Sequence, residues 1–487
     1  MKKHHFLLLI FILQLFFSAL LTRNHLYSHH FVDEDEFILG GKLINEDEKP
    51  YSDFYIQHQP FPYYLSSMLQ HSIPEPDVRS AIKTHRIFIW GWNALWGLAL
   101  FVVNPLAAVL FVGLWEVIKF DVFGSLFLAD NLVAYPVILC IALLIKRAQH
   151  SALTVIQTFL GLIAITVIVS TWQIGWFFAV GWFILLVSTH RRHPRLLNFI
   201  LHSCVGIGIF LICLLLLINF PVWPWFSTMI LGNADDCTYM FDSCSLGPRI
   251  ASGLLYPFST ASHLFTSFHI QPFIALLYLL SIFLLLRKRA FRVTSIGLFM
   301  FVTLLALRPL HATATMYEGF HKLPLLGSML YIILCIPLLL GQKRLSGLFF
   351  IILAGIVLYT RPYFLHTVSP EQEYTIQFSR FEKYANAINN NAREGDTLFV
   401  MPDEMFVYYL SNPHHASRFI FYLEWMVDKK GYKEEIRYLF KTNPPTWVYA
   451  NANNRRNISE EQEILLSGYE GVEVGGKKDI LYRRKTH

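Results

Sequence analysis

Long apolar runs constrain the fold of this 487-residue chain more than any other feature. A helix needs about 20 apolar residues to cross the roughly 30 Å hydrocarbon core of a membrane. Runs approaching that length lie near 6–22, 87–103, 105–119, 125–145, 152–170, 172–189, 196–220, 271–286, 291–307, 324–340 and 345–360. Only 15% of the residues are charged, against roughly a quarter in soluble domains. The sequence therefore predicts a mainly α fold, a polytopic bundle of about eleven transmembrane helices.

Short basic clusters predict the orientation of these helices. With Lys2 and Lys3 in the cytoplasm, the later clusters at 146–147, 191–195, 287–292 and 343–344 also fall on the cytoplasmic side, as the positive-inside rule prefers. This holds only if the chain breaks at Asn104-Pro105, because one merged helix there would move every later cluster outside. The net charge of +6 lies mostly in these clusters, which indicates membrane topology and no nucleic-acid partner. We expect an integral, multi-pass protein with a cytoplasmic N-terminus.

The long non-apolar segments then share the extracytoplasmic face. They are the first outer loop at 23–86, a second loop at 221–270 and the tail from 361. The tail alternates helix-like stretches (378–389 and 434–440) with strand-like ones (397–400 and 446–450), a pattern typical of a small α/β domain. The predicted domains are a transmembrane domain at 1–360, which includes both loops, and an extracytoplasmic α/β domain at 361–487.

The first outer loop carries the run with the clearest chemical content, Asp33-Glu34-Asp35-Glu36. Four consecutive acids close to a membrane span are costly to hold near lipid without a purpose. The ordinary alternative is a solvated acidic face on a helix beside the membrane. Aromatic residues at 51–55 follow the acids and suit the membrane interface, which favours the functional interpretation.

The arrangement resembles the GT-C glycosyltransferases, specifically the branch of protein O-mannosyltransferases, aminoarabinose transferases and RgtA/B/C/D-like enzymes. In that branch an Asp-Glu pair opens the first outer loop and an aromatic residue follows three positions after the Glu, as Asp33, Glu34 and Phe37 do here. The later elements Lys49-Pro50-Tyr51-Ser52-Asp53-Phe54 and His58-Gln59-Pro60 are also similar to that branch. A second acid is expected at the start of the fourth span, where Asp130 stands.

The resemblance implies transfer of a sugar from a polyprenyl-phosphate donor to an acceptor hydroxyl, with inversion, on the extracytoplasmic face. The acceptor would be a lipid, a glycan or a protein. A carboxylate would remove the proton of the attacking hydroxyl, and Asp33 is the candidate base. Glu34 and Asp130 would orient the acceptor or the base, or help to hold a divalent cation. Because Asp35-Glu36 is also an Asp-Glu pair, a register two residues later is the alternative.

The leaving lipid phosphate requires positive charge or hydrogen-bond donors. The candidates at the outer face are Arg86, Arg308, His321, Lys322 and His58. For each of the cationic residues, the alternative is a side chain that snorkels to the membrane interface. For His58 the alternative is an ordinary loop histidine.

A metal site is a further hypothesis for the first outer loop. His25, His29, His30 and Asp33 lie close together in the sequence, and imidazole with carboxylate suits zinc or manganese. The histidines lack a typical ligand spacing, so the metal remains an open alternative.

Three other functions compete with a lipid-dependent glycosyltransferase. A multi-span transporter or flippase of lipid-linked sugars would place its polar groups near the membrane midplane and often shows internal repeats, and no repeat is visible here. A polysaccharide polymerase or ligase would place its key residues in a large later loop. The tail alone could also be a binding domain.

Overall fold

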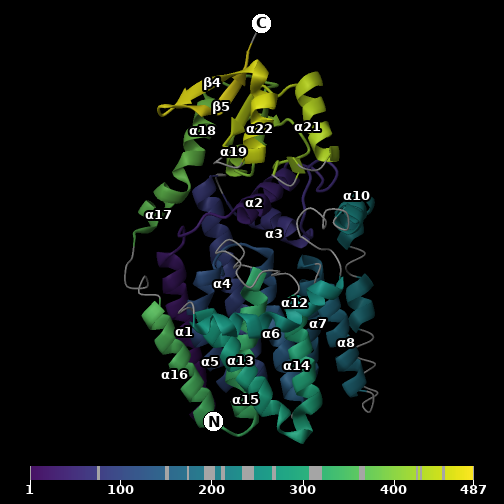
Figure 1. Ribbon diagram of the computed structural model, residues 1–487, viewed down its shortest axis with the longest axis vertical. Helices are drawn as coiled ribbons and strands as arrows, with labels where there is room; N and C mark the ends of the chain where they lie inside the picture. The colour runs from purple at the N-terminus through teal and green to yellow at the C-terminus, as the bar shows by residue number, and fades with distance from the viewer. Residues whose placement is uncertain are drawn as a thin grey trace. The chain divides into compact units, whose positions relative to one another are not determined.

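The computed structural model describes residues 2–73, 77–148, 153–172, 175–190, 203–209, 214–232, 246–265, 270–306, 321–360, 368–423, 426–427, 430–451 and 456–485. The described chain is mainly helical and forms two compact units (Figure 1). We call them the helical unit and the α/β unit. The helical unit comprises Met1–Leu26, Arg86–Ile218 and Ser245–Val368, and the α/β unit comprises Tyr27–His85, Asn219–Cys244 and Ser369–His487.

The helical unit contains most of the predicted spans as helices. Its main helices are α1 (Lys2–Asn24), the greater part of α4 (Val78–Val103), α5 (Pro105–Ile118), α6 (Ala129–Ala148), α7 (Val155–Thr171), α8 (Gly175–His190), α12 (Leu246–Ser262), α13 (Ile270–Leu286), α14 (Arg292–Leu305), α15 (Leu323–Leu339) and α16 (Lys343–Thr360). Helix α15 packs against α5, α6, α13 and α16. Its residues 323–337 are all buried, so α15 forms the centre of this unit.

Among the described residues, three helices are long and apolar enough to cross a membrane, namely His4–Asn24, Val78–Val103 and Ala129–Ala148. Only 22% of the most apolar window of the first is buried, against 89% of that of α6. The apolar side chains Phe6, Leu9 and Phe16 of α1 are exposed, a surface that suits contact with lipid. The other apolar helices of 10–17 residues, such as α5 and α15, are shorter than this length. The count of eleven spans therefore stays a prediction, and the predicted span at 196–220 is described only at 203–209 and 214–220.

The predicted break at Asn104-Pro105 is confirmed. Helix α4 ends at Val103, and α5 begins at Pro105. Asn104 has an extended backbone (φ −152°, ψ 95°), and its side-chain oxygen accepts a hydrogen bond from the backbone N–H of Ala107 at 3.3 Å. An N-cap Asn followed by Pro at the first helical position starts a new helix, which explains why the apolar run does not continue as one helix.

The segment predicted as an outer loop at 221–270 contains a helix of 17 residues. Residues 246–262 form α12, which packs against α13 and α14 within the helical unit. This segment was not among the predicted spans because its apolar run is short: Leu254, Leu255 and Tyr256 lie between Ser252 and Ser259, and Pro257 follows them directly. Packing against two apolar helices supplies the burial that an isolated amphipathic segment lacks.

The α/β unit is built on a five-stranded sheet. Its strands are β1 (Thr397–Met401), β2 (His414–His415), β3 (Trp447–Ala450), β4 (Tyr469–Val474) and β5 (Lys477–Arg484), in the order β2-β1-β3-β5-β4. Strand β1 is parallel to β2 and β3, whereas β5 is antiparallel to β3 and β4. The accompanying helices are α17 (Pro370–Gln377), α18 (Ser379–Asn389), α19 (Phe406–Leu410), α21 (Lys430–Thr442) and α22 (Arg456–Leu465). The small C-terminal sheet confirms the strand and helix positions predicted for the tail.

The hairpin of β4 and β5 was not predicted. Gly475 and Gly476 join the two strands with φ values of +59° and +81°. Two consecutive positive φ angles define the tight turn that best matches the twist of a hairpin. The Gly-Gly pair was the available signal for this turn.

The first outer loop belongs to the α/β unit, which differs from the predicted division into 1–360 and 361–487. Its helices α2 (Val32–Asn45) and α3 (Phe61–Gln70) pack on each other, and α2 packs against α19. The backbone N–H of Tyr55 donates to the Arg418 carbonyl at 2.6 Å. The short helix α10 (Val222–Phe226) also lies in this unit.

Candidate functional site

The acidic run forms the first turn of α2. The helix begins at Val32, after Phe31 in an extended conformation, and Asp33, Glu34 and Asp35 lie in the first turn. Carboxylates there interact favourably with the positive end of the helix dipole. Glu34 and Asp35 are fully buried and Glu36 is 2% exposed, whereas the Asp33 side chain is 17% exposed. Asp33 is therefore the most accessible of the four carboxyl groups.

His58 lies beside two of these acids. Its Nε2 is 3.8 Å from Asp33 Oδ2 and 3.7 Å from Glu36 Oε2. Residues three apart on a helix share a face, so Asp33 and Glu36 both point toward the imidazole. The Phe37 ring contacts that of His58, and the Tyr51 hydroxyl donates to the His58 carbonyl at 2.7 Å. Three residues predicted from the sequence thus lie together: Asp33, His58 and, from the alternative register, Glu36. We call them the Asp33 cluster.

Burial makes Glu36 a weak acid. Desolvation and then the nearby charge of Asp33 raise the pKa of Glu36 from 4.5 to about 8, although the Tyr63 hydroxyl donates a hydrogen bond to its Oε1 and favours the ionised form. At neutral pH the Glu36 carboxyl group therefore holds its proton. The Asp33 cluster then combines a neutral carboxylic acid with a more exposed carboxyl group.

This raised pKa predicts how stability depends on pH. Between about pH 5 and 8 the folded protein keeps a proton on Glu36 that the unfolded chain has lost, so the free energy of unfolding falls as pH rises, by up to about 1.4 kcal/mol per pH unit. Glu36→Gln is expected to flatten this decline. The measurement is the unfolding temperature between pH 5 and 8, with Glu435→Gln, which replaces a half-exposed acid paired with Arg418, as the control. Equal slopes in wild type and Glu36→Gln would contradict the raised pKa.

The two residues of the alternative register are separated: Glu36 lies in the Asp33 cluster, whereas Asp35 faces His30. Asp35 Oδ2 is 2.6 Å from His30 Nε2. Burial lowers the pKa of His30 to about 4 and raises the pKa of Asp35, so the pair is a neutral hydrogen bond. The His30 ring packs against Phe378, Phe381 and Phe406. Asp35 is therefore enclosed by the C-terminal part of the α/β unit, which favours a supporting role for it.

Two acids near this pair were not singled out from the sequence. Asp403 and Glu404 follow the carboxyl end of β1, and both are buried. Glu404 accepts hydrogen bonds from the Tyr449 hydroxyl and from Asn451 Nδ2, the latter at 3.1 Å, and it pairs with Arg380 at 3.1 Å. The available signal was their position, because polar residues at the carboxyl ends of parallel strands commonly form sites.

The helical unit brings together two other predicted residues. Asp130 lies in the first turn of α6 and is buried, and its Oδ2 is 3.3 Å from Nδ1 of His321, which precedes α15. The packing of α6 against α15 joins these residues across 191 positions of sequence. Lys322, next in the chain, is also buried.

The remaining two candidates for phosphate binding are Arg86 and Arg308. Arg86 is fully buried, and its Nη1 donates to the Leu26 carbonyl at 2.8 Å. A side chain that snorkels to the membrane interface keeps its charged group in water, whereas Arg86 is buried to its end. Arg308 lies outside the described residues.

The helical unit contains a buried ion pair that was not predicted from the sequence. Lys119 Nζ is 2.7 Å from Glu116 Oε2, and both residues are buried. Glu116 also accepts hydrogen bonds from the Ser18 hydroxyl and from the Tyr135 hydroxyl, the latter at 2.6 Å. Ionisable residues within apolar segments are costly and often functional. The isolated acid in the run 105–119 was the signal that could have identified this pair.

The described side chains contain no group of three or more His, Cys, Asp or Glu residues arranged to hold a metal ion. The hypothetical set of His25, His29, His30 and Asp33 is thus not assembled as a metal site, and His30 binds Asp35 instead. No protein-family model, no curated protein and no solved structure matches the chain. The features that bear on function are the Asp33 cluster, the Asp130–His321 pair and the helices that are long and apolar enough to cross a membrane.

Proposed function

We propose that the protein is an integral membrane glycosyltransferase of the GT-C type, which transfers a sugar from a polyprenyl-phosphate donor to the hydroxyl of a lipid, glycan or protein acceptor. One observation carries the proposal. The acidic run places one partly exposed carboxyl group, Asp33, beside His58 and a buried acid, Glu36, in the loop after an apolar helix long enough to span a membrane.

Asp33 has the role of general base in this reaction. It accepts the proton of the acceptor hydroxyl as that oxygen forms a bond to the anomeric carbon. The bond between the anomeric carbon and the phosphate oxygen breaks, and polyprenyl phosphate leaves with the bonding electrons from the opposite face, so the configuration inverts. When two neighbouring carboxyl groups have different surroundings, their pKa values differ, and one can stay protonated while the other acts as a base. Glu36, with a pKa of about 8, stays neutral, and the more exposed Asp33 takes the role of the base beside His58.

The other predicted residues have supporting roles in this proposal. Glu34 is fully buried next to Asp33, which suits a residue that positions the base. Within the helical unit, His321, Lys322 and Arg86 carry hydrogen-bond donors and positive charge, the groups that a lipid phosphate requires. Asp130 holds the imidazole of His321 at 3.3 Å and would orient it.

The test is sugar transfer by the purified, full-length protein in lipid vesicles. Radiolabelled polyprenyl-phosphate hexoses and pentoses are supplied with a glycolipid acceptor fraction, and label is measured in the acceptor and in released sugar. Transfer or donor hydrolysis that requires the carboxyl group of Asp33 supports the proposal. Donor that remains intact while it crosses the bilayer would contradict it and favour a carrier.

The proposed orientation predicts which residues an impermeant reagent reaches. In a variant without the native cysteines, Asn391→Cys in the α/β unit is expected to react with an impermeant maleimide in intact cells. The matched control is Arg344→Cys, at an exposed position in the first turn of α16, which is expected to react only after permeabilisation. The reverse pattern would contradict a cytoplasmic N-terminus with an extracytoplasmic α/β unit.

The alternative function, a transporter or flippase of lipid-linked sugars, is favoured by one specific observation. The Glu116–Lys119 pair is buried among apolar helices, and such pairs often mark transport pathways. If the protein is a carrier, Glu116→Gln should stop translocation of a fluorescent lipid-linked sugar across vesicles, and Asp33→Asn should leave it unchanged. The glycosyltransferase proposal expects no translocation by wild type.

A further inference from the structure

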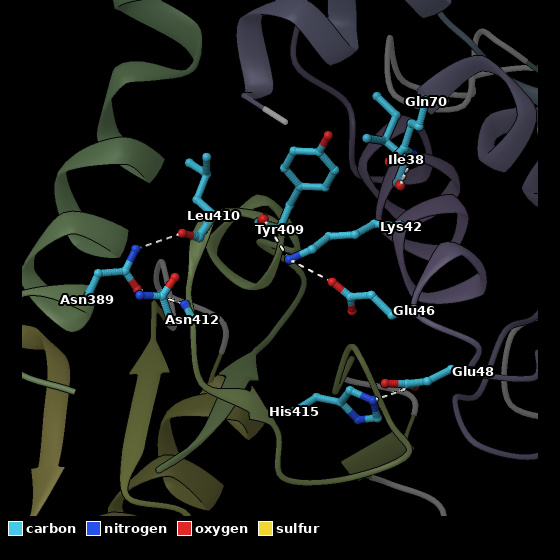
Figure 2. A network of polar contacts seen from close by, with 10 residues as sticks. All are labelled: Ile38, Lys42, Glu46, Glu48, Gln70, Asn389, Tyr409, Leu410, Asn412 and His415. Atoms are coloured by element: carbon cyan, nitrogen blue, oxygen red, sulfur yellow. Dashed lines mark hydrogen bonds and ion pairs between the residues drawn. The ribbon is translucent and has the colours of Figure 1, made fainter. Parts of the chain in front are cut away.

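The α/β unit contains a small polar pocket that none of the residues assigned to the transfer step lines. The second half of α2 and the turn after it form one wall, and residues 408–420 form the other. The cavity is about 60 Å³, which corresponds to room for about four to six water molecules. Its polar lining includes Lys42, Glu46, Glu48, Ser411, Asn412 and His415, most of whose contacts are visible in Figure 2.

The charges of this pocket are already paired within the protein. Lys42 Nζ donates to the Tyr409 carbonyl at 3.0 Å and is 3.6 Å from Glu46 Oε1 (Figure 2). His415 Nε2 is 2.7 Å from Glu48 Oε2. Two cationic side chains thus face two carboxylates. A pocket with this balance favours a neutral polar ligand over a phosphate or a cation, since neither sign of charge is in excess.

The protonation of His415 supports this balance. Its Nδ1 is 2.7 Å from the Ser417 carbonyl oxygen, and its Nε2 is at the Glu48 carboxylate, so both ring nitrogens face acceptors and both carry hydrogen. Burial alone lowers the pKa of His415, but the hydrogen bond and charge of Glu48 raise it overall. The His415–Glu48 pair is therefore an ion pair, with a protonated imidazole beside a carboxylate.

Ser411 presents a hydroxyl group that is left without a partner. The residue is only 6% exposed, and among the residues that the structure describes none hydrogen-bonds its Oγ. The backbone on both sides of it is held by Asn389, which donates from Nδ2 to the Leu410 carbonyl at 2.9 Å and accepts at Oδ1 from the Asn412 N–H at 2.8 Å (Figure 2). A buried hydroxyl without a partner is costly, and here it stands in a fixed position on the wall of a pocket.

We propose that this pocket binds the hydroxyl groups of a neutral saccharide. Carboxylates accept hydrogen bonds from sugar hydroxyls, an amide and a hydroxyl can both donate and accept, and the apolar side chains of Leu39 and Ile420 in the lining suit the C–H face of a sugar ring. Resting on the proposed function, the pocket is a subsite for a sugar of the acceptor, and it lies on α2, the helix that carries Asp33. A hydroxyl group of the sugar would form a hydrogen bond with the Ser411 hydroxyl, which has no partner among the described residues.

The test is ligand-observed saturation-transfer NMR on the purified full-length protein with methyl α-D-mannopyranoside and methyl β-D-glucopyranoside at up to about 10 mM. At least one glycoside is expected to bind. Ser411→Ala should weaken binding about fivefold, as expected for one hydrogen bond, and Ser411→Leu, which fills the pocket, should abolish it. The control is Ser379→Ala, whose hydroxyl donates to the Thr375 carbonyl on an exposed helix turn, and it should bind as wild type does.

Three results would overturn the proposal: no saturation transfer from either glycoside, binding that survives in Ser411→Leu, or displacement of the glycoside by inorganic phosphate. The transfer assay separates this proposal from the proposed function. In that assay Ser411→Ala should raise KM for the acceptor and leave kcat unchanged, whereas Asp33→Asn should lower kcat and retain glycoside binding. If wild type binds a glycoside but transfers no sugar, the proposed function is contradicted and the saccharide pocket is supported. If wild type transfers sugar but binds no glycoside, the saccharide pocket is contradicted and the proposed function is supported.

Discussion

Asp33→Asn is expected to abolish sugar transfer, with kcat lowered about 10²- to 10⁴-fold, the usual contribution of a general base. The amide has almost the same shape as the carboxyl group but cannot accept the proton of the acceptor hydroxyl. Because the Asp33 side chain is the most exposed of the four acids, the variant should still fold and insert. Transfer from the polyprenyl-phosphate donor in vesicles measures kcat, and glycoside binding at the Ser411 pocket reports on folding.

Two matched variants make this result specific. Asp53→Asn changes an acid of the same loop, whose Oδ2 accepts the Lys49 N–H at 2.8 Å in an exposed turn, and it should retain kcat. Asp35→Asn tests the alternative register. Because Asp35 is buried against His30, we expect it to lower stability more than kcat. Full activity in Asp33→Asn together with an inactive, folded Asp35→Asn would show that the register is two residues later.

Gly41→Val is expected to destabilise the α/β unit by about 1–3 kcal/mol or more, the usual cost of overpacking. A Cβ added at Gly41 would lie 2.7 Å from the backbone nitrogen of Ser67 in α3. Backbone cannot rotate away as a side chain can, so α2 and α3 must separate. Their separation would also move Glu36 away from Tyr63, which connects the two helices.

The unfolding temperature followed by tryptophan fluorescence measures this loss, which should be several degrees. The matched control is Gly297→Val in α14, where an added Cβ meets nothing within 4 Å. Limited proteolysis should cut Gly41→Val within residues 27–85 sooner than wild type or the control. An unfolding temperature equal to that of wild type would contradict the close packing of α2 on α3.

Sequence patterns predicted the local elements well and the long-range docking poorly. Apolar runs placed most helices of the helical unit, and Asn104-Pro105 marked the break between α4 and α5 because capping is local chemistry. The strands β1 and β3 were also visible as short apolar runs. The position of the first outer loop in the α/β unit was not visible, because it depends on contacts such as that of Tyr55 with Arg418, which no periodicity encodes.

The same distinction holds for the candidate site. The acids at 33–36 and the nearby His58 were recognisable as a motif, and the structure places Asp33, Glu36 and His58 together. The pairing of buried Asp35 with His30 was not recognisable, since the His30 ring packs against Phe378, Phe381 and Phe406 from a distant part of the sequence. Glu404 was missed for a similar reason: its partner Tyr449 lies in the neighbouring strand β3, and its partner Asn451 directly follows that strand.

The docking of α2 on the C-terminal part of the chain has a consequence for how the protein is made. Lys42 and Tyr409 are separated by 367 residues, as are Glu48 and His415. At the usual 5–20 residues per second of synthesis, the ribosome needs roughly 20–70 s to reach the second partner after the first. During that interval the acidic turn has none of its C-terminal contacts, and His30 has no aromatic ring to pack against. A chain that is released early would contain the whole acidic motif but would lack the C-terminal residues that pack around it. Activity would therefore appear only once the last quarter of the chain has emerged.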